Sequence, residues 1–154
     1  MMLSLGERLV VDASVAIKWV VSETGNERAI TLLDYSLVVP DLVFAECANV
    51  LWRKLRRREI SAEEADIAAQ ALEQADLTVV STRGYVTRAV TIASELDHPA
   101  YDSIYLALAE ALDLRLVTAD DSFVRKVGQG RAVFRDLLLP LSDIAPSGQS
   151  GYSA

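Results

Sequence analysis

The strongest constraint on the fold is the alternation of short apolar runs with longer segments of helical periodicity. The β-branched runs predict strands at Arg8–Val11, Leu37–Val39, Leu77–Val80, Leu114–Val117 and Ala132–Phe134. The segments between them predict helices at Ala13–Val21, Glu23–Tyr35, Asp41–Arg58, Ala62–Ala75, Gly84–Leu96, Tyr101–Leu112 and Asp120–Val127. Strands that are apolar almost throughout are typical of a parallel sheet covered by helices on both faces. The sequence therefore predicts an α/β fold, in which the long pair Asp41–Arg58 and Ala62–Ala75 forms a helical hairpin between strands.

The length and composition of the chain indicate one globular domain. Its 154 residues, 51% apolar and 24% charged, match a single domain and exclude wholesale disorder. We expect the domain to span residues 1–141, because residues 142–154 are small and polar and predict a frayed tail. The sequence shows neither a secretory leader nor an apolar run of the roughly 20 residues that a membrane span needs. Together with a single cysteine, this predicts a cytoplasmic protein without a membrane association.

Four acidic residues lie where the predicted elements bring them close to one another. Asp12 and Asp120 each follow a predicted strand, and the carboxyl ends of parallel strands form the ligand-binding edge of such a sheet. Asp102 lies in the first turn of a helix that is apolar almost all round, and such helices are usually buried. Glu46 has Leu42 as a helical neighbour, which is unusual for a solvated face. The pattern therefore predicts that these carboxylates form one site.

Helix capping is the alternative interpretation of these residues. Asp12, Asp102 and Asp120 each stand near a predicted helix N-terminus, where a carboxylate accepts hydrogen bonds from free N–H groups. Clustered carboxylates, however, repel one another unless a cation lies between them. Because the acidic residues offer only oxygen ligands without EF-hand spacing, they favour Mg²⁺ or Mn²⁺ over zinc or Ca²⁺. Such a site is typical of phosphodiester hydrolysis, in which a metal ion activates water and neutralises phosphate charge.

Four segments of the sequence follow one another in a familiar order: VVDASVAIKW, VVPDLVFAECANVLWR, AYDSIYLALAEAL and LRLVTADDSF. In this order the chain resembles the PIN-domain ribonucleases, most closely the VapC-type toxins of toxin–antitoxin pairs, over about residues 8–135. The resemblance implies a three-layer α/β/α sandwich with a mostly parallel central sheet and an inserted helical hairpin. It also implies a metal-dependent endoribonuclease that hydrolyses RNA phosphodiester bonds, is inhibited by a VapB-like antitoxin and forms a homodimer.

The resemblance assigns roles to individual residues. The catalytic and metal-binding acids of the family match Asp12, Glu46, Asp102 and Asp120, with Mg²⁺ as the expected ion and Mn²⁺ as an alternative. Ser14 and Thr118 match polar positions that can orient such ligands through hydrogen bonds. Asp121 is an additional acid beside the fourth position, and its role stays open.

The distribution of charge bears on whether the chain can bind RNA. A net charge of −7 disfavours phosphate binding, but a third of the 15 basic residues lie within Arg53–Arg58. This run can contact RNA, or it can remain solvated and complement the dipole of the helix that it ends. His98, the only histidine, precedes Pro99 in a predicted loop, and the pattern does not favour a catalytic role for it.

Two other functions fit parts of the sequence. A phosphohydrolase on a doubly wound α/β fold would use Asp12 as its nucleophile, but one such class needs an acid two residues later, where Ser14 stands. A catalytically inactive PIN-like binding module is disfavoured because all four acidic positions are present.

Overall fold

The structure is a computed structural model that describes residues 3–4 and 6–146 of the chain. The strands are β1 (Arg8–Val11), β2 (Ser36–Pro40), β3 (Thr78–Val80), β4 (Arg115–Thr118) and β5 (Leu138–Pro140). The helices are α1 (Ala13–Ala16), α2 (Asn26–Thr31), α3 (Leu42–Arg56), α4 (Ala62–Gln74), α5 (Val86–Leu96), α6 (Ala100–Leu112), α7 (Asp121–Gly128) and α8 (Ala132–Leu137). Short 3₁₀ turns are η1 (Ile17–Trp19), η2 (Leu32–Asp34), η3 (Thr82–Tyr85) and η4 (Leu141–Asp143).

The strands form one parallel sheet in the order β3-β2-β1-β4-β5. β1 is central: Val10 pairs with Val38 of β2 on one side and with Leu116 of β4 on the other. Its last three residues are fully buried, as its apolar sequence predicts for a strand covered on both faces. Since all pairings are parallel, the carboxyl ends of the strands lie at one edge of the sheet.

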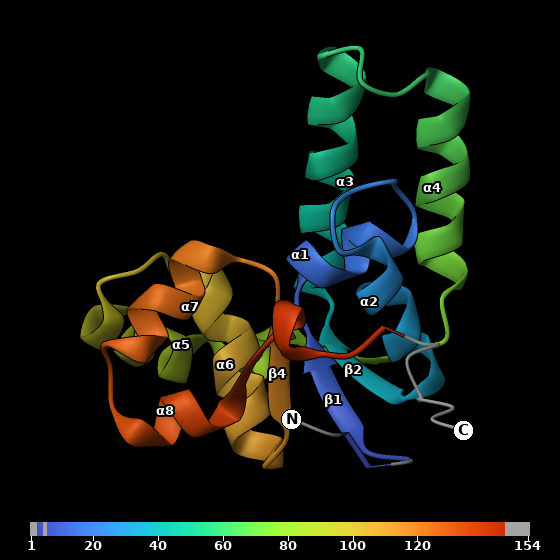
Figure 1. Cartoon of the computed structure of the whole chain (residues 1–154). Helices are drawn as coiled ribbons and strands as arrows, with labels where there is room; N and C mark the ends of the chain where they lie inside the picture. The colour runs from blue at the N-terminus through green and yellow to red at the C-terminus, as the bar shows by residue number, and fades with distance from the viewer. Residues whose placement is uncertain (1–2, 5, 147–154) are drawn as a thin grey trace, which may run out of the picture.

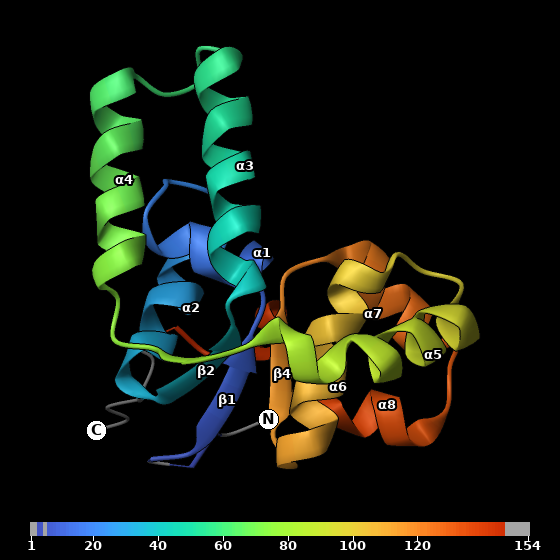
Figure 2. The same cartoon turned by 180° about the vertical axis from the view of Figure 1, so that it is seen from behind.

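Helices cover both faces of the sheet and make a three-layer α/β/α sandwich (Figures 1 and 2). From β1 to β3 the chain moves along the sheet in one direction, then crosses back to β4 and continues to β5. Because parallel crossovers are right-handed, this reversal places α1–α4 on one face and α5–α8 on the other. The predicted α/β fold is therefore confirmed.

Helix α6 lies at the centre of the core, against β1, β2 and β4, with α5 packed against it. All of its residues from Ser103 to Ala109 are buried, as its apolar sequence predicts. Neither α6 nor any other helix in the described part of the chain is long and apolar enough to cross a bilayer. Because it is packed on several sides, α6 holds Asp102 of its first turn in a fixed position.

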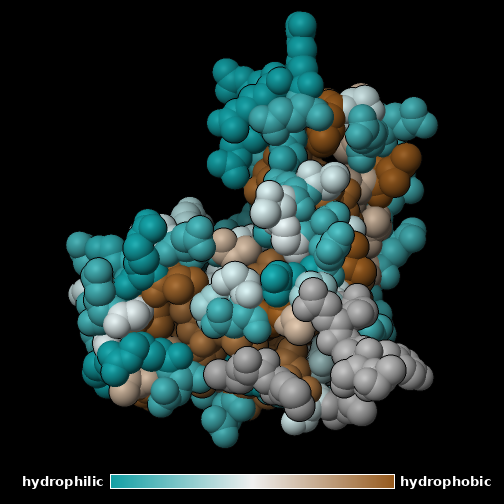
Figure 3. Space-filling view, viewed as in Figure 1, coloured by the Kyte–Doolittle hydropathy of each residue, from teal (hydrophilic) through white to brown (hydrophobic). Residues whose placement is uncertain are grey.

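Helices α3 and α4 form the predicted hairpin, which projects from the body of the domain as an arm (Figure 1). A capping box begins α4: the Ser61 hydroxyl accepts from the Glu64 N–H at 3.0 Å, and the Glu64 carboxylate accepts from the Ser61 N–H at 3.1 Å. The tip of the arm is hydrophilic, and the surface is hollowed between the arm and the lobe of α5–α8 (Figure 3).

The predicted strand at Ala132–Phe134 is wrong. These residues begin α8, and the edge strand is β5, a few residues later. Valine and phenylalanine at 133 and 134 favoured a strand, but one helical turn is enough to bury Phe134 while Val133 stays exposed. Tertiary burial of a single side chain therefore outweighs the local β propensity.

The predicted helices Ala13–Val21 and Glu23–Tyr35 are shorter than their apolar periodicity indicates. α1 passes into η1 after one turn, and α2 begins only at Asn26 and passes into η2. The Trp19 indole N–H donates to the Ala29 carbonyl at 2.8 Å, which ties the end of η1 to α2. Gly25 precedes α2 with a φ of 87°, a left-handed conformation that favours glycine and interrupts the helix.

Packing continues beyond the predicted domain limit at residue 141. η4 follows β5, Ile144 is buried, and the Arg28 guanidinium donates to the Ile144 carbonyl. The folded domain therefore includes at least Ile144, whereas residues 147–154 of the predicted tail lie outside the described residues.

Candidate active site

Two of the predicted carboxylates are brought together by the neighbouring strands β1 and β4. Asp12 directly follows β1, and Asp120 lies two residues after β4. Val11 pairs with Val117, and the Asp12 N–H donates to the Val117 carbonyl at 3.4 Å. From this point the chain leaves β1 toward one face and β4 toward the other, an arrangement that opens a crevice at the carboxyl edge.

The Asp12 carboxylate is buried, with 2% of the residue exposed. One oxygen accepts from the Ser14 hydroxyl and from the Val15 N–H, so Asp12 also caps α1. The other oxygen accepts from the Thr118 hydroxyl. The pKa of Asp12 is raised to about 7, mainly by burial and further by the charge of Asp102, although the hydrogen bonds oppose the shift. Asp12 therefore combines the capping role with a position inside the site.

Ser14 and Thr118 connect the two strand ends, in agreement with the orienting role expected for them. The Ser14 oxygen accepts from the Ala119 N–H at 2.9 Å, and the Thr118 oxygen accepts from the Asp120 N–H at 3.1 Å. Both hydroxyls donate to Asp12. The network fixes the Asp12 carboxylate relative to the segment that carries Asp120.

Glu46 enters the site from α3 and is positioned by α6. One of its oxygens accepts from the hydroxyl of the fully buried Tyr105 at 2.6 Å. Partial burial raises the pKa of Glu46 and the charge of Asp102 raises it further, while the Tyr105 hydrogen bond opposes this. Tyr105 was not identified from the sequence, because a tyrosine in an apolar helix is typical of a core residue.

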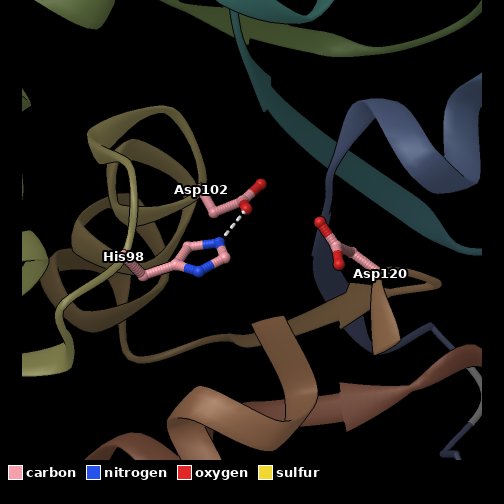
Figure 4. Close-up of side chains that lie close together, drawn as sticks. All are labelled: His98, Asp102 and Asp120. Carbon is pink, nitrogen blue, oxygen red and sulfur yellow. Dashed lines mark hydrogen bonds and ion pairs between the residues drawn. The ribbon is translucent and has the colours of Figure 1, made fainter. Parts of the chain in front are cut away.

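Asp102 and Asp120 lie close together in the site, with His98 beside them (Figure 4). One ligand atom from each of these three residues lies within 4.8 Å of the others. The His98 Nε2 lies 2.6 Å from Asp102 Oδ2, and Asp120 accepts from the Phe123 N–H at 3.1 Å, which caps α7. Burial raises the pKa of Asp102 and the charge of Asp120 adds to this, while His98 opposes it. His98 is therefore part of the site, although the sequence pattern did not favour it.

The four predicted carboxylates line one cleft of about 520 Å³ between α3 and α6. Asn49 and Arg53 of α3 and Tyr101 of α6 also line it. Among residues 3–4 and 6–146, no Lys or Arg forms an ion pair with any of these carboxylates. Crowded carboxylates without a lysine or arginine partner repel one another, and the raised pKa values of three of them express this cost together with that of burial.

The donor set fits a hard divalent cation. Glu46, Asp102 and Asp120 each have one oxygen bound by a hydroxyl, imidazole or main-chain N–H, and each retains lone pairs for a further ligand. Carboxylate oxygens are the ligands that Mg²⁺ and Mn²⁺ prefer, and these ions also keep waters in their coordination shell. An ion of this kind polarises a phosphodiester and activates water.

Asp121 lies outside the cleft. Although it neighbours Asp120, its side chain is exposed and borders a separate hollow, which Lys18, Arg28 and the end of β5 also line. The structure therefore gives Asp121 no place among the clustered carboxylates.

The basic run at the end of α3 does not act as one surface. Arg53 lines the cleft. Lys54 bridges Glu23 at 2.8 Å and Glu59 at 3.5 Å, and the Arg56 guanidinium lies 5.5 Å from the centre of the Trp52 ring. Within the run, Arg53 is therefore the cation placed beside the carboxylates.

Comparisons with known proteins agree with this geometry. Residues 9–128 match the PIN domain family. Ribonuclease VapC9 of Mycobacterium tuberculosis (strain CDC 1551 / Oshkosh) is 37% identical over 112 residues, which are 73% of this chain and 85% of that protein. The crystal structure of PAE2754 from Pyrobaculum aerophilum has a TM-score of 0.66 and 20% sequence identity to this chain. The match covers 90% of this chain and 86% of the PAE2754 chain.

A toxin-antitoxin complex from Klebsiella pneumoniae contains a chain of the same fold. Its TM-score is 0.54 at 16% identity, over 73% of this chain and 86% of that chain. The match to the family includes all four predicted acidic positions, and the match to Ribonuclease VapC9 extends over most of the length of that protein. The chain therefore belongs to the PIN domain family and, within it, to the group of the VapC ribonucleases.

Proposed function

We propose that this chain is a metal-dependent endoribonuclease that hydrolyses RNA phosphodiester bonds and acts as the toxin of a toxin–antitoxin pair. The observation that carries this proposal is the convergence of Asp12, Glu46, Asp102 and Asp120 on one cleft. A family relative is named as a ribonuclease, and a structural neighbour is a toxin-antitoxin complex. The fold, the acidic cluster and the relatives support the same function.

In this proposal the carboxylates hold Mg²⁺ or Mn²⁺ in the cleft. When bound, the ion supplies Lewis acidity toward a phosphodiester oxygen and lowers the pKa of water. Ser14 and Thr118 keep the Asp12 carboxylate in one orientation, and Tyr105 does the same for Glu46. One of the carboxylates accepts the proton of the attacking water.

Arg53 gives the acidic cleft a contact for the substrate. A polyanion is repelled by clustered carboxylates, so a cation beside them is needed to bind the phosphates that flank the scissile bond. Arg53, Asn49 and Glu46 all line the cleft, because Arg53 follows Asn49 by about one helical turn and Glu46 by about two, on the same side of α3. The RNA backbone would therefore run along α3.

Cleavage of total cellular RNA by the purified chain tests the proposal. We expect discrete products that require Mg²⁺ or Mn²⁺, disappear with EDTA and are not formed by Asp12→Asn or Asp102→Asn. Asp121→Asn is the matched control, because it removes a neighbouring carboxylate outside the cleft. Cleavage by Asp12→Asn at the wild-type rate would contradict the site assignment. Metal binding without cleavage of any RNA would instead favour the PIN-like binding module.

The phosphohydrolase alternative is not supported by the surroundings of Asp12. A nucleophilic carboxylate needs an oxygen open to the phosphorus atom, but both Asp12 oxygens accept hydrogen bonds and the residue is 2% exposed. Asp12 is therefore poorly placed to attack a phosphate directly.

We also propose that a VapB-like antitoxin binds this chain and that the toxin is a homodimer in the cytoplasm. The arm leaves apolar side chains of Trp52, Leu55 and Ile67 exposed, a pattern that favours a protein partner. Light scattering after size-exclusion chromatography, with the chain alone and with a co-expressed antitoxin, measures both assemblies. A monomeric mass for the chain alone would contradict the homodimer.

A further inference from the structure

We propose that His98 is a positioning residue that holds the Asp102 carboxylate in its working orientation by donating a hydrogen bond from Nε2 to Oδ2. This inference rests on the proposed function, because it takes Asp102 to be a ligand of the metal ion.

The contact is short and shielded. His98 Nε2 and Asp102 Oδ2 are 2.6 Å apart, and the His98 side chain is 9% exposed. Figure 4 shows the second Asp102 oxygen pointing away from His98, on the side of the carboxylate that the imidazole leaves open. A donor on one oxygen therefore leaves the other to the cation, as in sites where partners of the ligands set their orientation.

The imidazole is itself fixed by the chain around it. Its ring lies 5.1 Å from the Phe123 ring, centre to centre, at an angle of 32°. Asp97, which follows the last residue of α5, has a left-handed φ of 49°, and the N–H of the next residue, His98, donates to the Ala93 carbonyl at 3.2 Å. Pro99 then restricts the backbone before α6. Because both its ring and its backbone are constrained, His98 is able to constrain Asp102.

The distance favours a hydrogen bond over joint coordination of one ion by both groups. Two neighbouring ligands of an octahedral Mg²⁺ ion lie about 3 Å apart, since each is about 2.1 Å from the metal. The observed 2.6 Å is shorter than this separation and lies at the short end of hydrogen bonds to a charged carboxylate, which are about 2.7–2.9 Å long for an N–H donor. His98 therefore acts on the ion through Asp102.

Three substitutions separate the hydrogen bond from the packing of the ring. His98→Phe keeps an aromatic ring against Phe123 but removes the donor. His98→Asn keeps an amide donor that is too short to reach Asp102, whereas the longer amide of His98→Gln takes the place of Nε2. We expect Mn²⁺ affinity, measured by calorimetry, to fall about 10-fold or more in His98→Phe and His98→Asn and to recover in His98→Gln. Melting curves in EDTA identify any variant that fails to fold. If His98→Phe does not fold, the Mn²⁺ affinities of His98→Asn and His98→Gln are compared with each other.

Two results would overturn the inference. One is a Mn²⁺ affinity that does not follow the hydrogen bond: either His98→Phe or His98→Asn binds Mn²⁺ as tightly as the wild type, or His98→Gln binds it no more tightly than these two variants. The other is an imidazole ¹⁴N coupling in the electron spin-echo spectrum of bound Mn²⁺, which would make His98 a direct ligand. Asp102→Asn serves as the reference: if it too binds Mn²⁺ normally, the proposed metal site fails. If Asp102→Asn alone loses Mn²⁺, only the role of His98 fails.

Discussion

The stability of the metal-free chain should depend on the charge of Asp12. In the folded chain burial raises the pKa of this carboxyl from 3.8 to about 7, a difference of about 3 units. At about 1.4 kcal/mol per unit, ionisation of Asp12 costs the folded state about 4 kcal/mol. Because the pKa is raised in the folded chain, the protonated Asp12 carboxyl contributes fully to the free energy of unfolding below about pH 4. This contribution is lost as the pH rises from there through about 7. About 2–3 kcal/mol of the loss falls between pH 5 and pH 8.

Asp12→Asn removes this ionisation without changing the size of the side chain. The free energy of unfolding of the wild type, relative to the variant, should therefore fall by about 2–3 kcal/mol from pH 5 to pH 8 in EDTA. For a chain of this length the change corresponds to a relative shift in melting temperature of about 5–10 °C. Urea unfolding followed by tryptophan fluorescence at both pH values measures the difference. The exposed Asp121→Asn serves as control and should give no such pH dependence.

Two outcomes test the reasoning. If the wild type and Asp12→Asn lose stability in parallel between pH 5 and pH 8, Asp12 is not an unusually costly charge in the folded state. Added Mg²⁺ or Mn²⁺ should stabilise the wild type at pH 8, by about 2.7 kcal/mol at 100 times its dissociation constant, and leave Asp12→Asn nearly unchanged. Equal stabilisation of both would place the ion elsewhere.

Other substitutions test the cleft and the arm separately. Arg53→Ala should raise KM for RNA with little change in kcat and reduce the salt dependence of binding, whereas Arg57→Ala, on the same exposed helix end, should do neither. A KM unchanged in Arg53→Ala would exclude the phosphate contact. Tyr105→Phe should lower Mn²⁺ affinity, measured by calorimetry, because Glu46 loses a 2.6 Å hydrogen bond that orients it. Ser61→Ala should reduce the free energy of unfolding by about 1 kcal/mol in urea titrations without changing cleavage, since it removes a helix cap far from the cleft. A loss of activity in this variant would couple the arm to catalysis.

The fold could be predicted largely because its signals are local. The buried positions of β1, β2 and β4 are apolar except for Thr118, and the capping box at Ser61 marks the start of α4 in the sequence itself. The errors come from positions where a single tertiary contact decides the structure. Phe134 is buried by one turn of α8, and Trp19 reaches across to Ala29. Neither contact has a periodic signature.

The carboxylates of the site were predictable for a different reason. Parallel strands end at the same edge, so Asp12 and Asp120 could be placed together without knowledge of any side-chain contact. His98 was missed because its role depends on the ring of Phe123, a residue from another helix. Its spacing of four residues before Asp102 was nevertheless visible, and an imidazole at that distance can reach a carboxylate in the first turn of a helix.

The pairing of β1 with β4 has a consequence for protein synthesis. The hydroxyls that orient Asp12 come from Ser14, which is made at once, and from Thr118, which is made 106 residues after Asp12. A ribosome-bound chain that stops before β4 carries Asp12, Glu46 and Asp102 but neither Thr118 nor Asp120. Such a chain has no complete cleft, so termination before β4 leaves a fragment that lacks part of the proposed site. The proposed nuclease site is thus assembled only after β4 and the segment that carries Asp120 have been synthesised.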